Sequence, residues 1–272
     1  MGRMLRLAAG LRIVLVAVFL SAGLASCATQ PEKTVAAAEA PMPDPFIGVN
    51  KHIFAFNDAV DTMLIRPVAY VYREATPRPI KGIVTNFLGH LTLPVTIIND
   101  LLQGKPDQAK IAFGRLFLNT IVGIGGLFDV ATPAGFPMHR EDMGQTFAVH
   151  GAEPGPYIVL PIIGPSSTRD VFGRVIDTVI DPVSISTYGS NAGQALRIGR
   201  TVGDGIVARE RLIEPLDALR ESIDYYAAVR SAYRQRRSQE IRDGLPKADG
   251  VEGDPFASFE TEQKTPKAGG SR

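Results

Sequence analysis

The chain has 272 residues, and its 29 Lys and Arg nearly balance its 28 Asp and Glu, which gives a formal net charge of +1. This balance offers no basic surface for nucleic acid, so we exclude nucleic acid as a partner. A single cysteine cannot form a disulfide within the chain, and the length suffices for one large domain or two small ones.

The first 26 residues have the pattern of a bacterial lipoprotein signal peptide. Basic residues precede an apolar core from Ile13 to Leu20, and Leu24-Ala25-Ser26 comes directly before Cys27, as in a lipobox. The apolar core is shorter than the ~20 residues that a membrane span needs. We therefore predict cleavage before Cys27 and lipidation of that cysteine, while a structural cysteine and a retained signal anchor are the alternatives. Ala28 after the cysteine favours the outer membrane.

The two ends of the chain differ in composition from its middle. Residues 28–43 hold mostly Ala, Pro, Glu and Thr, which suits a flexible tether. The last segment is polar, and we expect it to be disordered. The predicted organisation is a signal peptide (1–26), a lipidated tether (27–43), a helical domain (44–243) and a disordered tail (244–272).

Helix signals dominate the predicted domain. Asp44-Pro45 begins a helix that continues from Phe46 to Met63, with Asp as the N-cap and Pro at the first position. Gly104 ends a helix over Thr92 to Gln103, and Pro106 begins the next one.

Two later helices are predicted to be amphipathic. Ser167 and Asp170 form a capping-box pattern. The helix behind it carries an apolar stripe, with polar residues opposite: Val171, Phe172, Val175, Ile176, Val179 and Ile180 against Arg169, Arg174, Asp177 and Thr178. The last helix, about Glu214 to Ile241, should lie on a core or on a partner through residues at three-to-four spacing: Leu216, Leu219, Ile223, Tyr226, Val229 and Tyr233.

Strand signals are nearly absent. The best candidate is Tyr157 to Ile163, bracketed by Gly155-Pro156 and Gly164-Pro165. No period of 20 to 50 residues repeats, so a solenoid is excluded. We predict an all-α fold with at most a short β-hairpin.

The middle of the chain contains two stretches that are apolar on all sides. Gly82 to Leu102 carries one charge, Asp100, and Ile111 to Phe128 carries one, Arg115. Such a helix is either buried deeply or in contact with lipid. Glycine and proline interrupt both stretches, so a transmembrane span is disfavoured. Partial embedding in one membrane leaflet fits better, while a central core helix is the open alternative.

Motifs for catalysis are missing from the sequence. There is no G-x-x-x-x-G-K-[ST] loop, no G-x-S-x-G elbow and no H-E-x-x-H motif. We expect Gly123-Ile124-Gly125-Gly126 to end a helix rather than bind phosphate. The residues from His139 to Asp142, with Asp129 and His150 nearby, are the only candidate cluster for a metal or a general base. We expect no enzyme activity, no metal and no cofactor.

Several segments together resemble the MlaA (VacJ) lipoproteins. The resemblance covers about Asp44 to Ile241, and its most specific piece joins Gly155-Pro156-Tyr157-x-x-Leu160-Pro161 to Gly164-Pro165-x-x-x-Arg169-Asp170. The other matching segments include Asn50-Lys51-x-x-Phe54-x-Phe56-Asn57, Arg66-Pro67, Leu101-Leu102-Gln103-Gly104, Arg115-x-x-x-Asn119-Thr120-x-x-Gly123 and Gly144-Gln145-Thr146.

The resemblance implies a ring-like helical bundle lodged in one leaflet of the outer membrane, on its periplasmic side. It implies an amphipathic channel that takes mislocalised phospholipid from the outer leaflet, and therefore phospholipid as a partner. It also implies an outer-membrane porin trimer and a soluble periplasmic lipid carrier of the MlaC type as partners, with no catalytic residue and no cofactor.

A channel for a charged headgroup needs polar groups beside apolar surface, because an unpartnered charge in hydrocarbon costs several kcal/mol. The candidate channel or gating residues are Asn50, Phe54, Phe56, Asn57, Asp61, Asn86, Asn99, Arg115, Asn119, Tyr157 and Pro161. The alternative for each polar residue is a hydrogen bond within the core. The cations Arg234, Arg236 and Arg237 either favour the dipole at the end of the last helix or attract anionic headgroups.

Two other functions stay open. The chain could be a structural lipoprotein that tethers the outer membrane to a porin or a periplasmic partner without lipid transfer. It could also be a surface hydrolase acting on lipid, although this would need a nucleophile that the sequence does not display.

Overall fold

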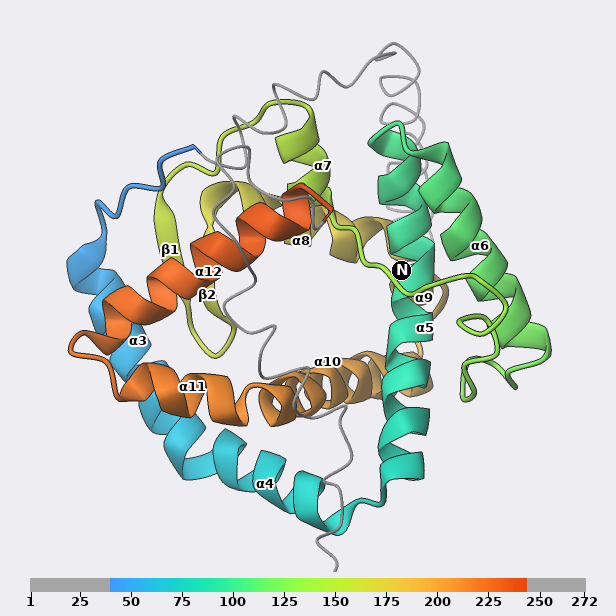
Figure 1. Cartoon of the computed structure of the whole chain (residues 1–272), viewed down its shortest axis with the longest axis horizontal. Coiled ribbons are helices and arrows are strands. Elements are labelled where there is room, and N and C mark those ends of the chain that lie inside the picture. Colours follow the sequence, from blue (N-terminus) through green and yellow to red (C-terminus); the bar gives the residue numbers. More distant parts are fainter. Residues whose placement is uncertain (1–39, 244–272) are drawn as a thin grey trace, which may run out of the picture.

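The computed structural model describes residues 40–243, whose helices follow one another around a ring (Figure 1). The predicted signal peptide, Cys27, residues 28–39 of the tether and the predicted tail lie outside these residues. In chain order the elements are α3 (Ile47–Val60), the π-helix η1 (Asp61–Ile65), α4 (Arg66–Ala75), α5 (Arg78–Leu102), α6 (Pro106–Ile121), α7 (Met143–Val149), β1 (Tyr157–Leu160), β2 (Gly164–Ser167), α8 (Thr168–Ile180), α9 (Pro182–Ser186), α10 (Asn191–Arg211), α11 (Ile213–Arg220) and α12 (Tyr225–Ile241). The predicted all-α ring with one short hairpin is confirmed.

The two ends of the described chain meet and close the ring. The Tyr226 hydroxyl donates to the Asp44 carboxylate at 2.6 Å, and Arg230 donates to the Met42 carbonyl at 2.8 Å. Elsewhere α4 and α5 pack against α10, and α6 packs against α5 (Figure 1). Helix α12 contacts both α7 and β2. The ring is therefore held by contacts between segments that lie far apart in the sequence.

Several predicted helix boundaries are confirmed, but the first helix begins at Ile47, so Asp44 is not its N-cap and accepts from Asn50 and Tyr226 instead. The helix also does not end at Met63, because η1 and α4 follow α3 directly. Gly104 adopts a positive φ of 72° after α5, and Pro106 begins α6. Ser167 accepts from the Asp170 N–H at 3.2 Å, as the capping box predicts. Helix α5, however, begins at Arg78 instead of Thr92 and continues through Pro94. Pro94 removes one backbone hydrogen bond from α5. The helix continues because it packs against both α6 and α10.

The predicted last helix is two helices. The chain leaves the helical path after Arg220, and Asp224 begins α12 by accepting from the Ala227 N–H at 3.0 Å. Ile223, which the apolar spacing placed on the buried stripe, is fully exposed at this break. The spacing of apolar residues was correct on both sides of the break, but it gave no sign of the N-cap within it.

Burial is inverted along α6 and α8. Helix α6 buries Arg115 and Asn119 while Phe113 and Phe117 are 59% and 56% exposed. Helix α8 is amphipathic as predicted, yet it buries Arg169 and Asp170, and Phe172, Val175 and Val179 of its apolar stripe are exposed. An amphipathic helix on a water-soluble protein turns its apolar stripe inward. These two helices do the opposite.

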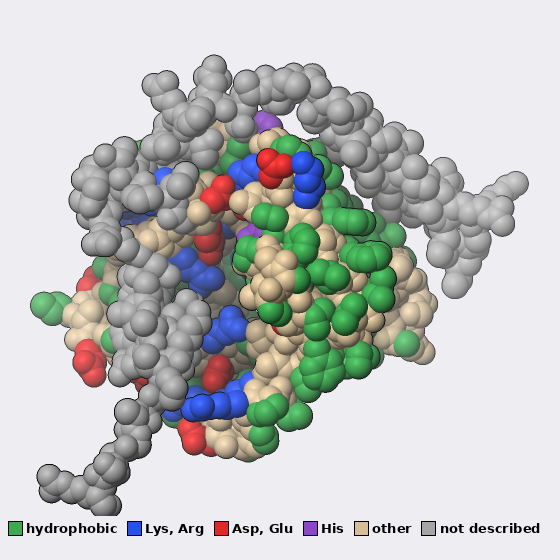
Figure 2. All heavy atoms as spheres, turned by 45° about the vertical axis from the view of Figure 1, so that its right-hand side comes forward, with side chains coloured by type: hydrophobic (Ala, Val, Ile, Leu, Met, Phe, Trp, Pro, Cys, Tyr) green, Lys and Arg blue, Asp and Glu red, His purple; other side chains and the backbone are tan. Residues whose placement is uncertain are grey.

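Exposed apolar side chains lie on most elements of the ring, and many of them gather on one side. Figure 2 shows them over the α5 and α6 side, with Lys, Arg, Asp and Glu side chains in the hollow beside it. Contiguous apolar patches of this kind mark contact with lipid or with another protein. None of the helices within residues 40–243 combines the length and the apolarity needed to cross a bilayer.

Within residues 40–243, the larger of two clusters of buried apolar residues lies beside the hairpin. Met42, Tyr157, Val159 and Tyr226 are buried together, and Phe54 packs edge-on against Tyr226 with ring centroids 5.4 Å apart. Strand β1 pairs with β2 in antiparallel register, with Tyr157 opposite Ser167 and Leu160 opposite Gly164. The hairpin therefore supplies buried side chains from β1 and presents the α8 N-cap from β2.

Candidate functional site

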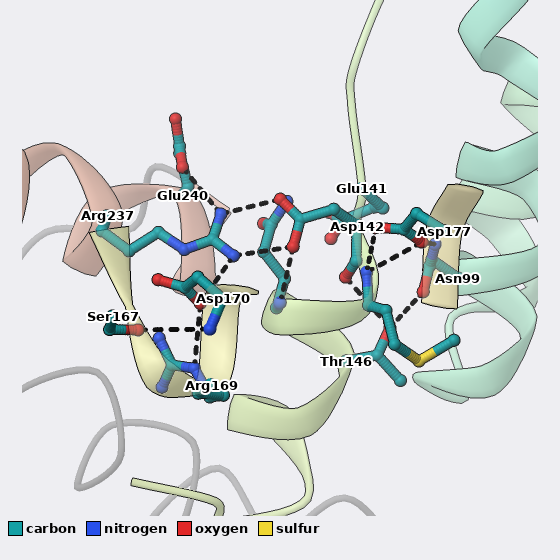
Figure 3. A network of polar contacts seen from close by, with 12 residues as sticks. Asn99, Glu141, Asp142, Thr146, Ser167, Arg169, Asp170, Asp177, Arg237 and Glu240 are labelled. Carbon is teal, nitrogen blue, oxygen red and sulfur yellow. Dashed lines mark hydrogen bonds and ion pairs between the residues drawn. The ribbon is translucent and has the colours of Figure 1, made fainter. Parts of the chain in front are cut away.

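A network of ion pairs around one buried arginine joins three helices (Figure 3). The Arg237 guanidinium, on α12, donates to both carboxylate oxygens of Asp142 at 2.8 and 2.6 Å. It also donates to Asp170 at 3.0 Å and to Glu240 at 2.9 Å. Asp142 caps α7 and Asp170 lies in the first turn of α8. One arginine thus ties together α7, α8 and α12.

The arginines of this network keep the Asp170 carboxylate ionised. Burial alone raises the pKa of Asp170, but Arg237 and Arg169 outweigh it and hold the pKa at about 2. The Tyr233 hydroxyl donates to the same carboxylate at 2.6 Å. Asp170 therefore stays charged at any physiological pH, and its interactions with Arg237 and Arg169 persist.

Two glycines let the helices approach closely enough to form the network. A Cβ atom at Gly173 of α8 would collide with the backbone of Gly144 in α7. A Cβ atom at Gly144 would in turn reach the Arg237 guanidinium and the Asp170 carboxylate. Neither glycine has a positive φ, so each is required for space and not for backbone conformation.

A second group of polar contacts joins α5, α7 and α8. The Thr146 hydroxyl donates to Asn99 Oδ1 at 2.7 Å, and Asn99 Nδ2 donates to the Asp177 carboxylate at 3.1 Å. The Met143 N–H donates to the same carboxylate at 3.0 Å. Burial raises the pKa of Asp177 to about 6 because these neutral donors only partly offset it. The Asp177 carboxylate has no cation within salt-bridge distance among the described residues.

Two pockets of about 430 and 420 Å³ open beside these networks. Arg140, Asp142, Arg174 and Asp177 line both of them, so the pockets adjoin. The first continues toward Tyr233, Arg236 and Glu240 of α12. The second continues toward α5, α9 and α10, and its further lining includes Thr92, Thr96, Thr178, Ser184, Arg197, Arg200 and Thr201. Together they form a polar inner surface within the ring.

The carboxylates of these pockets have partners, but three of the arginines have no carboxylate partner. Asp181 accepts from Arg200 at 2.8 Å, and Asp142 is held by Arg237. Within residues 40–243, no carboxylate lies at salt-bridge distance from Arg140, Arg174 or Arg197. Asp204 raises the pKa of Arg140, but desolvation outweighs it and lowers the pKa overall. Arg140 is nevertheless an exposed residue, so its guanidinium is accessible from the pockets that it lines.

The predicted residues of the first helix hold the hairpin. Asn50 Nδ2 donates to the Tyr157 carbonyl at 3.0 Å, and Asn50 Oδ1 accepts from the Val159 N–H at 3.0 Å. Asn57 Nδ2 donates to the Leu160 carbonyl at 2.9 Å, and Asn57 Oδ1 accepts from the Ile162 N–H at 2.7 Å. The structure therefore brings Asn50, Asn57, Tyr157 and the hairpin together. Phe54 lies in the hairpin core, whereas Phe56 is exposed and so is Pro161 at the hairpin tip.

The other predicted residues are spread around the ring. Asp61 in the π-helix accepts from Arg209 at 2.6 Å and from Arg220 at 2.9 Å. Arg115 donates to Asp129 at 2.7 Å, and Asn119 Oδ1 accepts from the Val130 and Ala131 N–H groups at 3.0 Å. Asn86 makes one long hydrogen bond, of 3.4 Å, to the Leu127 carbonyl.

None of the predicted channel or gating residues lines either of the two pockets described above. Asn99 comes nearest through its bond to Asp177. The five asparagines, Asp61 and Arg115 all hydrogen-bond another part of the chain through their side chains, which is the alternative that the sequence left open for each. The buried Tyr157 hydroxyl has no hydrogen-bond partner within the described residues. Their participation in lipid passage stays a prediction.

The two candidate clusters of the sequence have structural partners. His139 Nε2 lies 2.9 Å from the buried Asp100 carboxylate, and Glu141 accepts from Gln103 at 2.8 Å. In the described part of the chain no group of three or more His, Cys, Asp or Glu side chains is placed to hold a metal ion. Of the three cations near the end of the last helix, Arg237 is buried and pairs with Asp142, Asp170 and Glu240, a role that neither alternative included.

Sequence reasoning missed Arg197 and gave Arg140 and Arg174 no role in a binding pocket. Arg174 was recognised only as part of the polar face of α8, and Arg140 only as part of a polar loop. The pairing of charges between distant helices, which leaves these three arginines over, is visible only in three dimensions.

Comparison with known proteins identifies relatives of the whole ring. The family model described as "MlaA lipoprotein" matches residues 42–240. The "Intermembrane phospholipid transport system lipoprotein MlaA" of Escherichia coli is 36% identical over 197 residues, which cover 71% of this chain and 76% of the relative. The protein of the same name from Haemophilus influenzae is 28% identical over 207 residues, covering 72% and 78%. A solved structure described as "Structural basis for maintenance of bacterial outer membrane lipid asymmetry" superposes with a TM-score of 0.65 at 35% identity, over 73% of this chain and 99% of that chain.

Proposed function

Because the chain belongs to the MlaA lipoprotein family, we propose that it removes mislocalised phospholipid from the outer leaflet of the outer membrane and passes it to a periplasmic carrier. The lipid moves through the ring, which rests in the inner leaflet on the periplasmic side. The protein is held there by a lipid on Cys27, and it works beside an outer-membrane porin trimer and with a soluble carrier of the MlaC type. It catalyses no reaction and needs no cofactor.

The observation that carries this proposal is the inverted burial of α6 and α8. Their apolar side chains face outward, where they are stable only against lipid or another apolar surface. Their polar side chains face inward, toward pockets lined by arginine, aspartate and threonine. A phospholipid has the same two chemistries, a charged headgroup and apolar chains. A ring of this kind lets the headgroup cross the leaflet beside polar groups instead of through hydrocarbon.

The hairpin is the proposed gate of this path. Asn50 and Asn57 hold it on α3, and its tip residue Ile162 adopts a positive φ of 66°. A β-branched residue rarely adopts this conformation, and such strain is common in segments that switch. Paired substitutions in residues 50–57 and 157–165 should change detergent sensitivity and the amount of outer-leaflet phospholipid. Wild-type values of both would contradict the gate.

Quantifying outer-leaflet phospholipid in a deletion strain tests the proposed function directly. Deletion should raise outer-leaflet phospholipid, and the wild-type gene on a plasmid should restore it. A tethering lipoprotein would instead lose partner binding on deletion without any change in lipid asymmetry, so unchanged asymmetry would contradict transport.

Insertion of the ring into a leaflet needs a separate test. A Cys27→Ala variant produced without its signal peptide cannot be acylated, so any membrane binding must come from the ring. We expect it to need detergent for solubility and to bind liposomes of Escherichia coli polar lipid. A variant that stays soluble without detergent and binds no liposomes would contradict insertion.

A further inference from the structure

The inner pockets contain positive charge that the protein itself does not neutralise. Arg140 and Arg174 line both pockets, and Arg197 lines the second. Arg197 donates only to neutral oxygens, the Thr187 carbonyl at 3.1 Å and the Thr187 hydroxyl at 3.2 Å. Against these three guanidinium groups, Asp177 is the carboxylate of the described pockets that is left without a cation.

The neighbouring carboxylates do not compensate these arginines, because their own bonds already engage them. Asp142 receives two bonds from Arg237. Asp181 receives Arg200 and the Ser184 hydroxyl, the latter at 2.7 Å. Asp177 accepts from the Met143 N–H and from Asn99, and burial there favours its neutral form. An incoming anion could therefore pair with guanidinium groups that no carboxylate of the described chain engages.

The chemistry of the pocket suits a phosphodiester. A guanidinium offers a planar fork of N–H donors that matches two oxygens of a phosphate, and this is why arginine dominates phosphate recognition. Hydroxyl groups surround the three arginines, from Thr92 and Thr96 on α5 to Thr201 on α10. A volume of about 420 Å³ lies in the range of small-molecule sites, large enough for a glycerophosphate headgroup.

We propose that Arg140, Arg174 and Arg197 bind the phosphate of a phospholipid headgroup inside the ring, and that this site favours anionic headgroups over zwitterionic ones. The proposal rests on the function proposed above and names the part of the lipid that the inner surface recognises. An anionic headgroup such as phosphoglycerol carries no positive group that the three guanidinium groups would repel. The ammonium group of a zwitterionic headgroup would be placed among the same cations, with only Asp177 to receive it.

Binding measurements on the full-length protein in an uncharged detergent test the proposal. The probes are dihexanoyl phosphatidylglycerol, dihexanoyl phosphatidylcholine and inorganic phosphate, and the readout is the Kd from calorimetry. We expect the wild type to bind phosphatidylglycerol more tightly than phosphatidylcholine. Each of R140Q, R174Q and R197Q should weaken phosphatidylglycerol binding about 10-fold, the loss expected for a charge-assisted hydrogen bond.

The matched control is R234Q, because Arg234 is an exposed arginine of α12 that lines neither pocket. It should leave both affinities unchanged. The three glutamine variants remove no ion pair of the described chain, so we expect them to fold, and R174K tests whether charge alone restores binding. Affinity for phosphatidylglycerol within twofold of the wild type in all three glutamine variants would overturn the site. So would inorganic phosphate that binds as tightly as the lipid, since the site would then serve free phosphate.

Complementation of the deletion strain separates this proposal from the one it rests on. If the wild type restores lipid asymmetry and the glutamine variants bind lipid normally, only the arginine site is wrong. If the wild type fails to change outer-leaflet phospholipid, transport is wrong, and the binding series still decides whether the site takes phosphate.

Discussion

Apolar side chains are buried in the cluster beside the hairpin, whereas on α6 and α8 they are exposed and charged side chains are buried. Beside the hairpin, Val159 is 1% exposed and packs with Tyr157 and Tyr226, as in a water-soluble protein. On the other side Arg169 is buried and Phe172 is 67% exposed. Both sides use the same residue types at regular helix or strand spacing. The difference is the one that the proposed insertion requires, with polar side chains turned toward the inside of the ring and apolar side chains turned outward on α6 and α8.

Charge replaces apolar packing on the inverted side. The helices there are held by Arg237 with Asp142 and Asp170, and by Arg115 with Asp129. Burial alone raises the pKa of Asp129, but bonds from Thr132 and Arg115 outweigh it and hold the pKa at about 2. If this comparison is right, substitutions on the two sides should have opposite consequences for stability and for membrane contact.

The largest effect should follow removal of the arginine that joins three helices. Arg237→Ala leaves the partly exposed Asp142 without a cation and the buried Asp170 with Arg169 alone, and breaking a buried ion pair costs about 3–5 kcal/mol. The neighbouring Arg236→Ala removes an exposed pair with Glu240, which costs about 0–1 kcal/mol. Denaturation in detergent measures both. Equal losses for the two variants would show that charge does not hold this side.

The close approach of α7 and α8 gives the next effect. Gly173→Ala places a Cβ atom against the backbone of Gly144, which cannot move aside as a side chain can, and overpacking of this kind costs about 3 kcal/mol. The control is Gly199→Ala on α10, where a Cβ atom meets nothing within 4 Å. Alanine should raise the free energy of unfolding there by about 0.5–1 kcal/mol through helix propensity. A stable Gly173→Ala protein would contradict the tight contact.

A matched pair of valines tests the comparison most directly. Val159→Ala removes two buried methyl groups from the hairpin core and should lower the free energy of unfolding by about 2 kcal/mol. Val175→Ala removes the same groups from the exposed apolar face of α8 and should cost less than about 0.5 kcal/mol in detergent. It should instead weaken the binding of a non-acylated protein to liposomes, which Val159→Ala should leave unchanged. The reverse pattern would refute inverted burial.

Local signals in the sequence were sufficient for most elements. The N-cap at Ser167, the glycine stop at Gly104 and the proline start at Pro106 act within a few residues, so the sequence reveals them. The apolar stripe of α8 was also readable, because helical spacing needs no tertiary information. Whether the stripe faces inward or outward depends on the surrounding medium, and periodicity is the same in either case.

The site was less accessible to sequence reasoning than the fold. Asn50 and Asn57 were correctly selected as unusual, yet their partners lie more than a hundred residues away on the hairpin. The charge balance inside the ring depends on pairs such as Arg237 with Asp142, 95 positions apart. Whether an arginine lacks a carboxylate partner depends on where all the other helices place their Asp and Glu side chains. No window of sequence contains that information.

The smallest effect concerns the one pocket carboxylate without a cation. Burial raises the pKa of Asp177 to about 6 from 3.8, so the folded protein holds its proton more tightly than the unfolded chain does. Its contribution to stability is therefore complete below pH 3.8 and disappears as pH rises through 6. The pocket is open to water, which limits the effect to about 1 kcal/mol.

The wild type should be more stable at pH 5 than at pH 7.5, in part through Asp177. Asp177→Asn, whose amide oxygen can still accept from Met143 and Asn99, should reduce this difference by that amount. Denaturation midpoints in detergent at the two pH values measure it. If both proteins showed the same pH dependence, other groups such as His139 and Glu141 would account for all of it. The Asp177 carboxylate would then be as well solvated as one on the protein surface.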